Sequence, residues 1–154
     1  MSDRRGQAGF SVVEMVVVVV VLGILAAATL PVAKFTRTRI KEAELRYQLR
    51  TMRNAIDEYK RYSDAGLIPV ELGTDGYPRD LETLIEPIDL VGQVDMQKRF
   101  LRGIPTDPMT GEAEWGLRSY QDEPDSTSWG GENVYDVYSL SEGVGLNGRP
   151  YAEW

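Results

Sequence analysis

The longest apolar segment of the chain occupies residues 15–33, nineteen positions without a charged side chain. As an α-helix this segment measures about 28 Å, close to the bilayer's hydrocarbon core of about 30 Å. Six consecutive valines at 16–21 favour a strand in water, but the run far exceeds the usual length of a buried strand. In lipid a helix satisfies its own backbone. The pattern therefore predicts a transmembrane helix over residues 10–33.

A cleaved secretory signal peptide is the alternative interpretation of the same segment. Arg4 and Arg5 would form its basic start, and the small residues of LAAATLP would allow cleavage after Ala28. Two features oppose this interpretation. Glu14 interrupts the start of the apolar run, and the helical pattern continues beyond Pro31 into a charged amphipathic stretch. We therefore prefer the transmembrane interpretation.

Beyond residue 33 the apolar side chains recur at helical spacing. They form one stripe with steps of four, three, four and three residues, which consists of Leu45, Leu49, Met52, Ile56 and Tyr59. Arg46, Arg50, Arg53, Asp57 and Lys60 fall on other faces. Gly66 is a natural C-cap. One helix is therefore expected from Phe10 to about Tyr62, with residues 34–62 as an amphipathic stem packed on the rest of the chain.

Residues 63–154 predict a globular head of short elements. A loop at 67–78 precedes a short helix at 79–86, and a second short helix is expected at 95–101. Residues 103–112 are dense in Pro, Asp and Gly, which indicates turns. Strands are expected at 114–121 and 133–140, on either side of a polar loop at 122–132. A long helix followed by a small antiparallel sheet defines an α+β fold.

The net charge of −7 conceals an asymmetry between the stem and the head. Residues 34–62 hold nine Lys/Arg and four Asp/Glu, a net of +5, whereas residues 63–154 hold six and eighteen, a net of −12. A basic stretch beside an apolar run, followed by an acidic body, indicates a membrane-proximal stem that carries a solvated head. The acidic head argues against non-specific binding of nucleic acid.

The chain contains neither cysteine nor histidine. Disulfides and thiolate metal sites are thereby excluded, and the commonest general base and transition-metal ligand is missing. Asp122 and Asp125 lie in a loop with the composition of a solvated turn. An enzyme is therefore not expected, and no catalytic residue is assigned.

The sequence GFSVVE, followed by the long apolar run, resembles the processing site of type IV pilins and the related pseudopilins. The resemblance implies that a prepilin peptidase on the cytoplasmic face removes the leader, residues 1–9, by cutting after Gly9. It also implies N-methylation of the new N-terminal residue, Phe10. Glu14 and Pro31 match the family's glutamate and proline at the fifth and twenty-second mature positions.

An ionisable residue in an apolar span is a functional hypothesis by default. Glu14 lies about 6 Å along the helix from Phe10 and can stay near the lipid headgroups. In a bundle of packed helices its carboxylate needs a cation, and the resemblance supplies the amine freed at Phe10 of a neighbouring subunit. Because a half-made buried ion pair is strongly destabilising, we hypothesise that Glu14 sets subunit register during assembly. For Pro31 the alternatives are a local melting of the helix on assembly and a simple kink.

The head extends the resemblance to proteins related to the major, G-type pseudopilin of type II secretion, through GYPRDLETLI, FLRGIPTDPMTGEAEW and YDVYSLSEGVGLNGRPYAEW. Such proteins commonly bind calcium in the loop after the last long strand. Here the candidate ligands in that region are Asp136, Ser139 and Glu142, with backbone carbonyls, a poor set for an ion that favours six to eight oxygens. Alternatively, the glycines at 143, 145 and 148 merely shape a turn-rich loop. No other cofactor or metal is expected.

The resemblance implies a structural filament subunit, a pseudopilin of a type II secretion system. It would be a single-pass precursor in the bacterial inner membrane with its head in the periplasm, although the basic flank after residue 33 opposes this orientation by the positive-inside rule. The expected partners are copies of itself, minor pseudopilins, the prepilin peptidase, and the inner-membrane assembly platform with its cytoplasmic ATPase. The alternative is a pilin of another type IV system, for adhesion, motility or DNA uptake.

Overall fold

The structure, a computed structural model, describes residues 11–93 and 95–154, without the side chains of residues 28–33. In chain order its elements are α1 (Val12–Asp64), α2 (Glu82–Ile85), β1 (Ile88–Asp89), β2 (Gln97–Lys98), β3 (Gly116–Arg118), β4 (Asp136–Tyr138) and the 3-10 helix η1 (Tyr151–Glu153). The chain forms two compact units, Met1–Thr38 and Arg39–Trp154, which divide within α1. The expected α+β fold is confirmed.

Helix α1 confirms the predicted long helix and ends two residues beyond the expected Tyr62. Its backbone stays helical through position 31. After Asp64 the chain turns at Gly66, whose φ is +67°. The N–H of Gly66 donates to the carbonyl of Ser63, and the N–H of Leu67 donates to that of Tyr62. This is the Schellman motif, which favours glycine because its left-handed residue is strained with a Cβ.

The second unit is built around one face of α1. The predicted apolar stripe is buried, with Leu45, Met52 and Ile56 fully inaccessible and Leu49 2% exposed. The stripe packs against residues from every part of the head, namely Ile68, Leu81, Leu84, Leu90, Phe100, Leu101, Trp115, Val134, Val137 and Tyr151. Complete burial of one such aliphatic side chain contributes about 1.5–3 kcal/mol. The stem is therefore the central element of the head's core.

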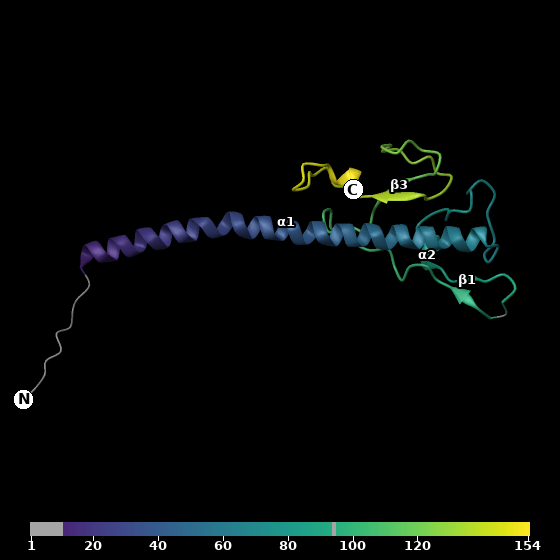
Figure 1. Ribbon diagram of the computed structural model, residues 1–154, viewed down its shortest axis with the longest axis horizontal. Coiled ribbons are helices and arrows are strands. Elements are labelled where there is room, and N and C mark those ends of the chain that lie inside the picture. Colours follow the sequence, from purple (N-terminus) through teal and green to yellow (C-terminus); the bar gives the residue numbers. More distant parts are fainter. Residues whose placement is uncertain (1–10, 94) are drawn as a thin grey trace, which may run out of the picture. The chain divides into compact units, whose positions relative to one another are not determined.

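The head's elements lie on both sides of α1 (Figure 1). α2, β1 and β2 lie on one side, and β3, β4 and the C-terminal segment on the other. Strands β1 and β2 pair antiparallel, with Ile88 opposite Lys98 and Asp89 opposite Gln97. The helix predicted at 95–101 is therefore wrong. The N–H groups of Phe100 and Leu101 both donate to the carbonyl of Leu84, at 3.1 and 2.8 Å, which holds this segment extended beside α2.

The two predicted strands around the polar loop are confirmed, although shorter than expected. β3 and β4 pair antiparallel, with Gly116 opposite Tyr138 and Arg118 opposite Asp136. A Cβ at position 116 would lie 2.2 Å from the Tyr138 ring, so only glycine lets the ring lie flat over the neighbouring strand. This register places Arg118 directly across from Asp136.

Candidate assembly segment and C-terminal clamp

The first turns of α1 present apolar side chains in every direction. All large apolar residues from Val12 to Leu25 are exposed, between 45% at Val18 and 79% at Val12. A continuous exposed apolar surface of this kind marks a site of contact with a membrane or another protein. Within the part of the chain that the structure describes, no helix combines the length and apolar character needed to cross a membrane. The transmembrane assignment of residues 10–33 stays a prediction.

The processing residues Gly9 and Phe10 lie outside the described residues, as does the leader, and the side chain of Pro31 is likewise not described. Glu14 is described: its side chain is exposed in the first turn of α1, where the positive end of the helix dipole favours a carboxylate. Nothing in a single chain tests the hypothesis that Glu14 pairs with a neighbour's amine.

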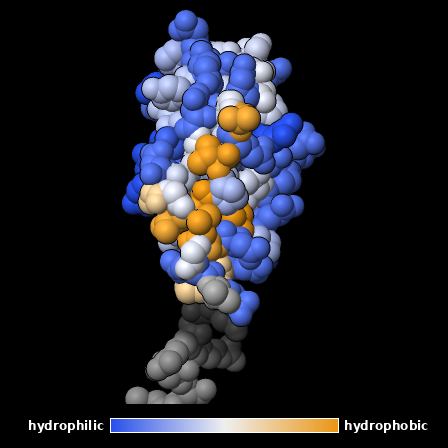
Figure 2. Space-filling model, turned by 90° about the vertical axis from the view of Figure 1, so that its right-hand side faces the viewer, coloured by the Kyte–Doolittle hydropathy of each residue, from blue (hydrophilic) through white to orange (hydrophobic). Residues whose placement is uncertain are grey.

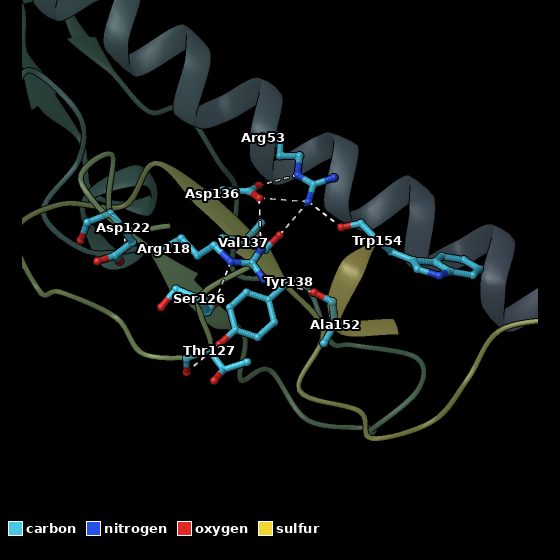
Figure 3. A network of polar contacts seen from close by, with 11 residues as sticks. Arg53, Arg118, Asp122, Ser126, Thr127, Asp136, Val137, Tyr138, Ala152 and Trp154 are labelled. Atoms are coloured by element: carbon cyan, nitrogen blue, oxygen red, sulfur yellow. Dashed lines mark hydrogen bonds and ion pairs between the residues drawn. The ribbon is translucent and has the colours of Figure 1, made fainter. Parts of the chain in front are cut away.

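In the second unit, Arg53 of α1 binds two separate segments of the C-terminal region, β4 and Trp154 (Figure 3). Its Nε donates to Oδ1 of Asp136 at 2.6 Å, and its Nη2 donates to Oδ2 of the same carboxylate at 3.4 Å. The same Nη2 donates to the backbone oxygens of Val137, at 3.0 Å, and Trp154, at 2.7 Å. One planar guanidinium thus joins α1 to β4 and to the end of η1, a use of its fork of donors that lysine lacks.

A second guanidinium, that of Arg118 on β3, completes this arrangement. Its Nη1 lies 3.5 Å from Oδ2 of Asp136, and it donates from Nε to the carbonyl of Ser126, at 2.8 Å, and from Nη2 to that of Ala152, at 3.2 Å. Its Cζ lies 4.1 Å from the centroid of the Tyr138 ring. The side chain is 9% exposed, so these partners replace water. We call Arg53, Arg118 and Asp136 the C-terminal clamp.

Glu42 of α1 fixes the same C-terminal region at a second point. This residue is 4% exposed. Its Oε1 accepts from the N–H of Leu146, at 2.7 Å, and from the hydroxyl of Tyr151, at 3.3 Å. Burial and the neighbouring Glu42 carboxylate both raise the pKa of Tyr151 above its usual value. Arg46, 3.9 Å from Glu42, stacks over the Trp154 ring at 4.2 Å.

The three candidate calcium ligands do not face one another. Asp136 is held by the two guanidiniums of the clamp, Glu142 is exposed, and the Ser139 hydroxyl donates to the buried Asp107 carboxylate at 2.6 Å. Among the described residues, no three acidic side chains gather in a metal-binding arrangement. The carbonyl of Val137, next to Asp136, already accepts from the Arg53 guanidinium. This donor set therefore does not fit calcium.

The sequence alone does not single out Glu42, Arg53 and Asp107, which organise this region together with Asp136, although some of them left a signal. Glu42 lies three residues before Leu45, so it continues the buried stripe backwards and marks an acid in need of partners. Arg53 follows the buried Met52 and was placed on another face. Asp107 lies in the stretch predicted as turns; there its Oδ1 accepts from the N–H of Met109 at 2.7 Å, a local turn. Its contact with Ser139 is 32 residues away and has no local signature.

Comparison with known proteins finds similarity in both parts of the chain. Residues 4–30 match the family described as the prokaryotic N-terminal methylation motif. Over 99% of its length the chain is 29% identical to the type II secretion system core protein G of Pseudomonas aeruginosa, of which it covers 98%. The resemblance to pilin-like proteins is confirmed. No solved structure matches the pilin-like chain.

The methylation motif covers the segment that contains Gly9, Phe10 and Glu14. In this pilin-like chain the match also includes the whole exposed apolar part of α1, from Val12 to Leu25. The full-length similarity extends over the stem and the head, where the C-terminal clamp lies. Both compact units thus have counterparts in the relative.

Proposed function

We propose that this protein is a structural filament subunit, a pseudopilin of a type II secretion system, and not an enzyme. The observation that carries the proposal is the methylation motif joined to an apolar helix and a pilin-like head. The precursor is inserted in the bacterial inner membrane with its head in the periplasm. It is cut after Gly9, methylated at Phe10 and polymerised with copies of itself and minor pseudopilins through the assembly platform and its ATPase.

Exposure of the apolar side chains from Val12 to Leu25 supports assembly. A helix that is apolar on all sides is stable only when it is surrounded, by lipid before assembly or by other helices afterwards. The head needs no such cover, because its own core buries the apolar stripe of α1. The division of the chain into two units matches a polymerising segment and a self-contained head.

Mass spectrometry of the protein purified from its host's membranes tests the processing step. We expect a mature chain that starts with N-methylated Phe10. A chain starting at Thr29 would identify a cleaved signal peptide instead, and an assembled protein that still starts at Met1 would overturn the proposal.

Deletion of the gene separates secretion from the alternative, a pilus of another type IV system. We expect proteins that normally reach the culture medium to accumulate in the periplasm of the deletion strain, and a plasmid copy to restore their export. Unchanged export together with loss of surface fibres, motility or DNA uptake would favour the alternative.

A further inference from the structure

One face of the head carries exposed apolar side chains that the core does not use (Figure 2). They come from the loop after α1 and from the β1–β2 hairpin, and they are Val70, Leu72, Val91 and Met96, exposed by 55, 104, 56 and 54%. The N–H of Val91 donates to the carbonyl of Leu67 at 2.8 Å, which ties the hairpin to the loop. Exposed apolar side chains grouped on a folded head indicate a contact surface.

This surface is also acidic. Residues 86–97 carry Glu86, Asp89 and Asp95 and no Lys or Arg. All three side chains are exposed. Among the described residues none of the three forms an ion pair, and Asp89 only accepts from the Gln97 amide, at 2.9 Å. We call Val91, Met96, Asp89 and Asp95 the hairpin patch; it needs a partner that is both apolar and basic.

The stem carries a surface that is both apolar and basic. Ile40 and Tyr47, seven residues apart on one helical face, are 62% and 61% exposed. The same stretch of α1 also borders a hollow of about 310 Å³, lined by Arg46, Leu49, Arg50, Arg53, Asn147, Arg149, Glu153 and Trp154. Four of its eight lining residues are arginines and one is an acid. We call Ile40, Tyr47, Arg46 and Arg50 the stem face.

Arg50 is the cation of the stem face with the fewest partners in its own chain. Its side chain is exposed, and its Nε donates only to the carbonyl of Arg46 in the same helix. Arg53, by contrast, is committed to the C-terminal clamp, and Arg149 lies 3.6 Å from Glu153. Of these arginines, Arg50 is therefore the one most available to pair with a carboxylate from another molecule.

The two surfaces cannot meet within one copy. Lys98 pairs with Glu58 at 2.8 Å, and the Phe100 ring lies 5.3 Å from that of Tyr62, so the hairpin is fixed beside the last turns of α1. Arg50 lies eight residues before Glu58, about 12 Å along the helix. The complementary surfaces are therefore offset, and they can be satisfied only by a second copy.

We propose, on the basis of the function proposed above, that the hairpin patch of one copy docks on the stem face of the next copy. The contact buries Val91 and Met96 against Ile40 and Tyr47 and brings Asp89 and Asp95 to Arg46 and Arg50. Because the two surfaces differ, the contact is heterologous: of two joined copies, one keeps a free stem face and the other keeps a free hairpin patch. Repetition of such a contact without ring closure yields a filament.

Disulfide cross-linking tests the contact in full-length protein, since the chain has no native cysteine. In cells that assemble filaments, we expect the double variant Tyr47→Cys/Met96→Cys to give a ladder of covalent oligomers after mild oxidation. Each single variant should give no ladder. A matched pair, Tyr47→Cys/Glu114→Cys, uses an exposed residue outside the patch and should give at least tenfold less cross-linked product.

The outcomes distinguish this contact from the proposed function. Filaments seen by electron microscopy without a Tyr47–Met96 ladder would overturn the docking contact and leave the function intact. A protein that forms no filaments and retains its leader would contradict the function itself.

Charge exchange gives a second test that does not depend on disulfide geometry. We expect Asp95→Arg and Arg50→Glu each to lower the yield of sheared filaments at least tenfold, and their combination in one chain to restore at least a third of it. Asp125→Arg, an exposed acid outside the patch, is the control and should assemble normally. Thermal unfolding of each purified variant verifies that the head is folded; a double variant that is folded yet as defective as the singles would refute the pairing.

Discussion

At the scale of single residues, the head depends on a few carboxylates that accept several hydrogen bonds each. Glu42, Asp107 and Asp136 are the clearest, because each links segments distant in sequence. A buried acceptor is modestly stabilising when satisfied, and its loss strands the donors around it. A single substitution at one of these three carboxylates is therefore expected to have a large effect on the stability of the head.

Glu42→Ala should lower the free energy of unfolding by about 1–3 kcal/mol, since the Leu146 N–H and the Tyr151 hydroxyl lose their acceptor. Glu42→Gln keeps an acceptor oxygen and should cost less. Urea unfolding followed by tryptophan fluorescence measures both. Glu44→Ala, an exposed acid on the same helix, should change stability by less than about 0.5 kcal/mol. Equal effects at positions 42 and 44 would contradict the role of Glu42.

The hydrogen bonds that the Asp122 carboxylate accepts predict that the stability of its loop depends on pH. The N–H groups of Ser119, at 2.7 Å, and Gly130, at 3.1 Å, donate to its Oδ2 and lower the pKa of the carboxyl group below its usual value of 3.8. A lowered folded-state pKa stabilises the fold above the unfolded pKa, and this stability disappears as the pH falls through the folded value.

Asp122→Asn should therefore lower stability at neutral pH, and the difference from the natural protein should vanish below the folded pKa. Urea midpoints measured between neutral pH and strongly acidic pH give this difference directly. Asp125→Asn, which changes a neighbouring exposed acid, is the control variant. A constant difference at all pH values would show that the charge of Asp122 is irrelevant.

At the scale of elements, the C-terminal clamp makes β4 and η1 depend on α1. Arg53 reaches Asp136, Val137 and Trp154, and Arg118 reaches Ala152 and Ser126. The last segment has only a three-residue 3-10 helix and one isolated bridge, between Val144 and Pro150, of its own. Its order therefore comes from these side chains and from the Tyr151 ring in the core.

Arg53→Ala should cost about 1.5–3 kcal/mol, because the three acceptors of Arg53 lose a charged donor while Arg118 still faces the Asp136 carboxylate. Amide hydrogen exchange should accelerate most in residues 143–154. Arg53→Lys should recover only part of the protection, since one ammonium cannot replace the guanidinium fork. Arg50→Ala is the matched control on the same helix, and equal exchange in the Arg50 and Arg53 variants would contradict the clamp.

The same arrangement predicts the response to calcium. Because Asp136 already faces two guanidiniums, we expect the melting temperature to be the same within about 2 °C in excess calcium and in excess chelator, a difference below about 1 kcal/mol. Differential scanning calorimetry with magnesium as the control ion measures this. A calcium-specific rise of 5 °C or more would restore the three predicted ligands as a metal site.

Elements with a strong local pattern were predictable, and those determined by distant contacts were not. The long helix, its buried stripe and Gly66 follow from periodicity and cap chemistry, and the strands at β3 and β4 follow from alternating aromatic and β-branched residues. The helix prediction for residues 95–101 was wrong because hydrogen bonds to the Leu84 carbonyl and the ion pair of Lys98 with Glu58 hold this segment extended. The helix expected at 79–86 shrinks to Glu82–Ile85, since Pro87 forces Glu86 to an extended conformation.

The candidate site was likewise predictable from the sequence only where its residues are close together in the chain. The motif that contains the predicted processing residues was recognisable because it is contiguous in sequence, and its match at residues 4–30 is confirmed. The clamp was not recognisable, because Arg53 and Trp154 are 101 residues apart and no local spacing connects them. Only Glu42, an acid at the position that continues the apolar stripe backwards from Leu45, gave a hint from sequence.

At the scale of the whole molecule, the two compact units have different requirements. The second unit, Arg39–Trp154, consists of the head and most of the stem and has a core of its own, whereas the large apolar side chains between Val12 and Leu25 are all exposed. Substitutions in the first unit should therefore alter assembly without altering the unfolding of the head.

Glu14→Ala tests that separation. We expect the yield of sheared filaments to fall at least tenfold while the melting temperature of the head stays the same, since Glu14 lies outside the unit that holds the core. Glu14→Gln, which keeps the shape and removes the charge, should be equally defective if an ion pair sets the register. Normal assembly of either variant would remove the hypothesis.

The clamp also imposes an order on biogenesis. Arg53 and Glu42 leave the ribosome roughly a hundred residues before the backbone groups that they bind, as the separations of 101 and 109 positions show. Until residues 143–154 are synthesised, the stripe of α1 lacks Tyr151, Glu42 lacks both of its donors and Arg53 lacks the Trp154 carbonyl, so one side of the head is incomplete. A premature stop codon anywhere in the final dozen codons should therefore yield an incompletely folded chain that cellular proteases degrade, even though all of the sequence before residue 143 is present.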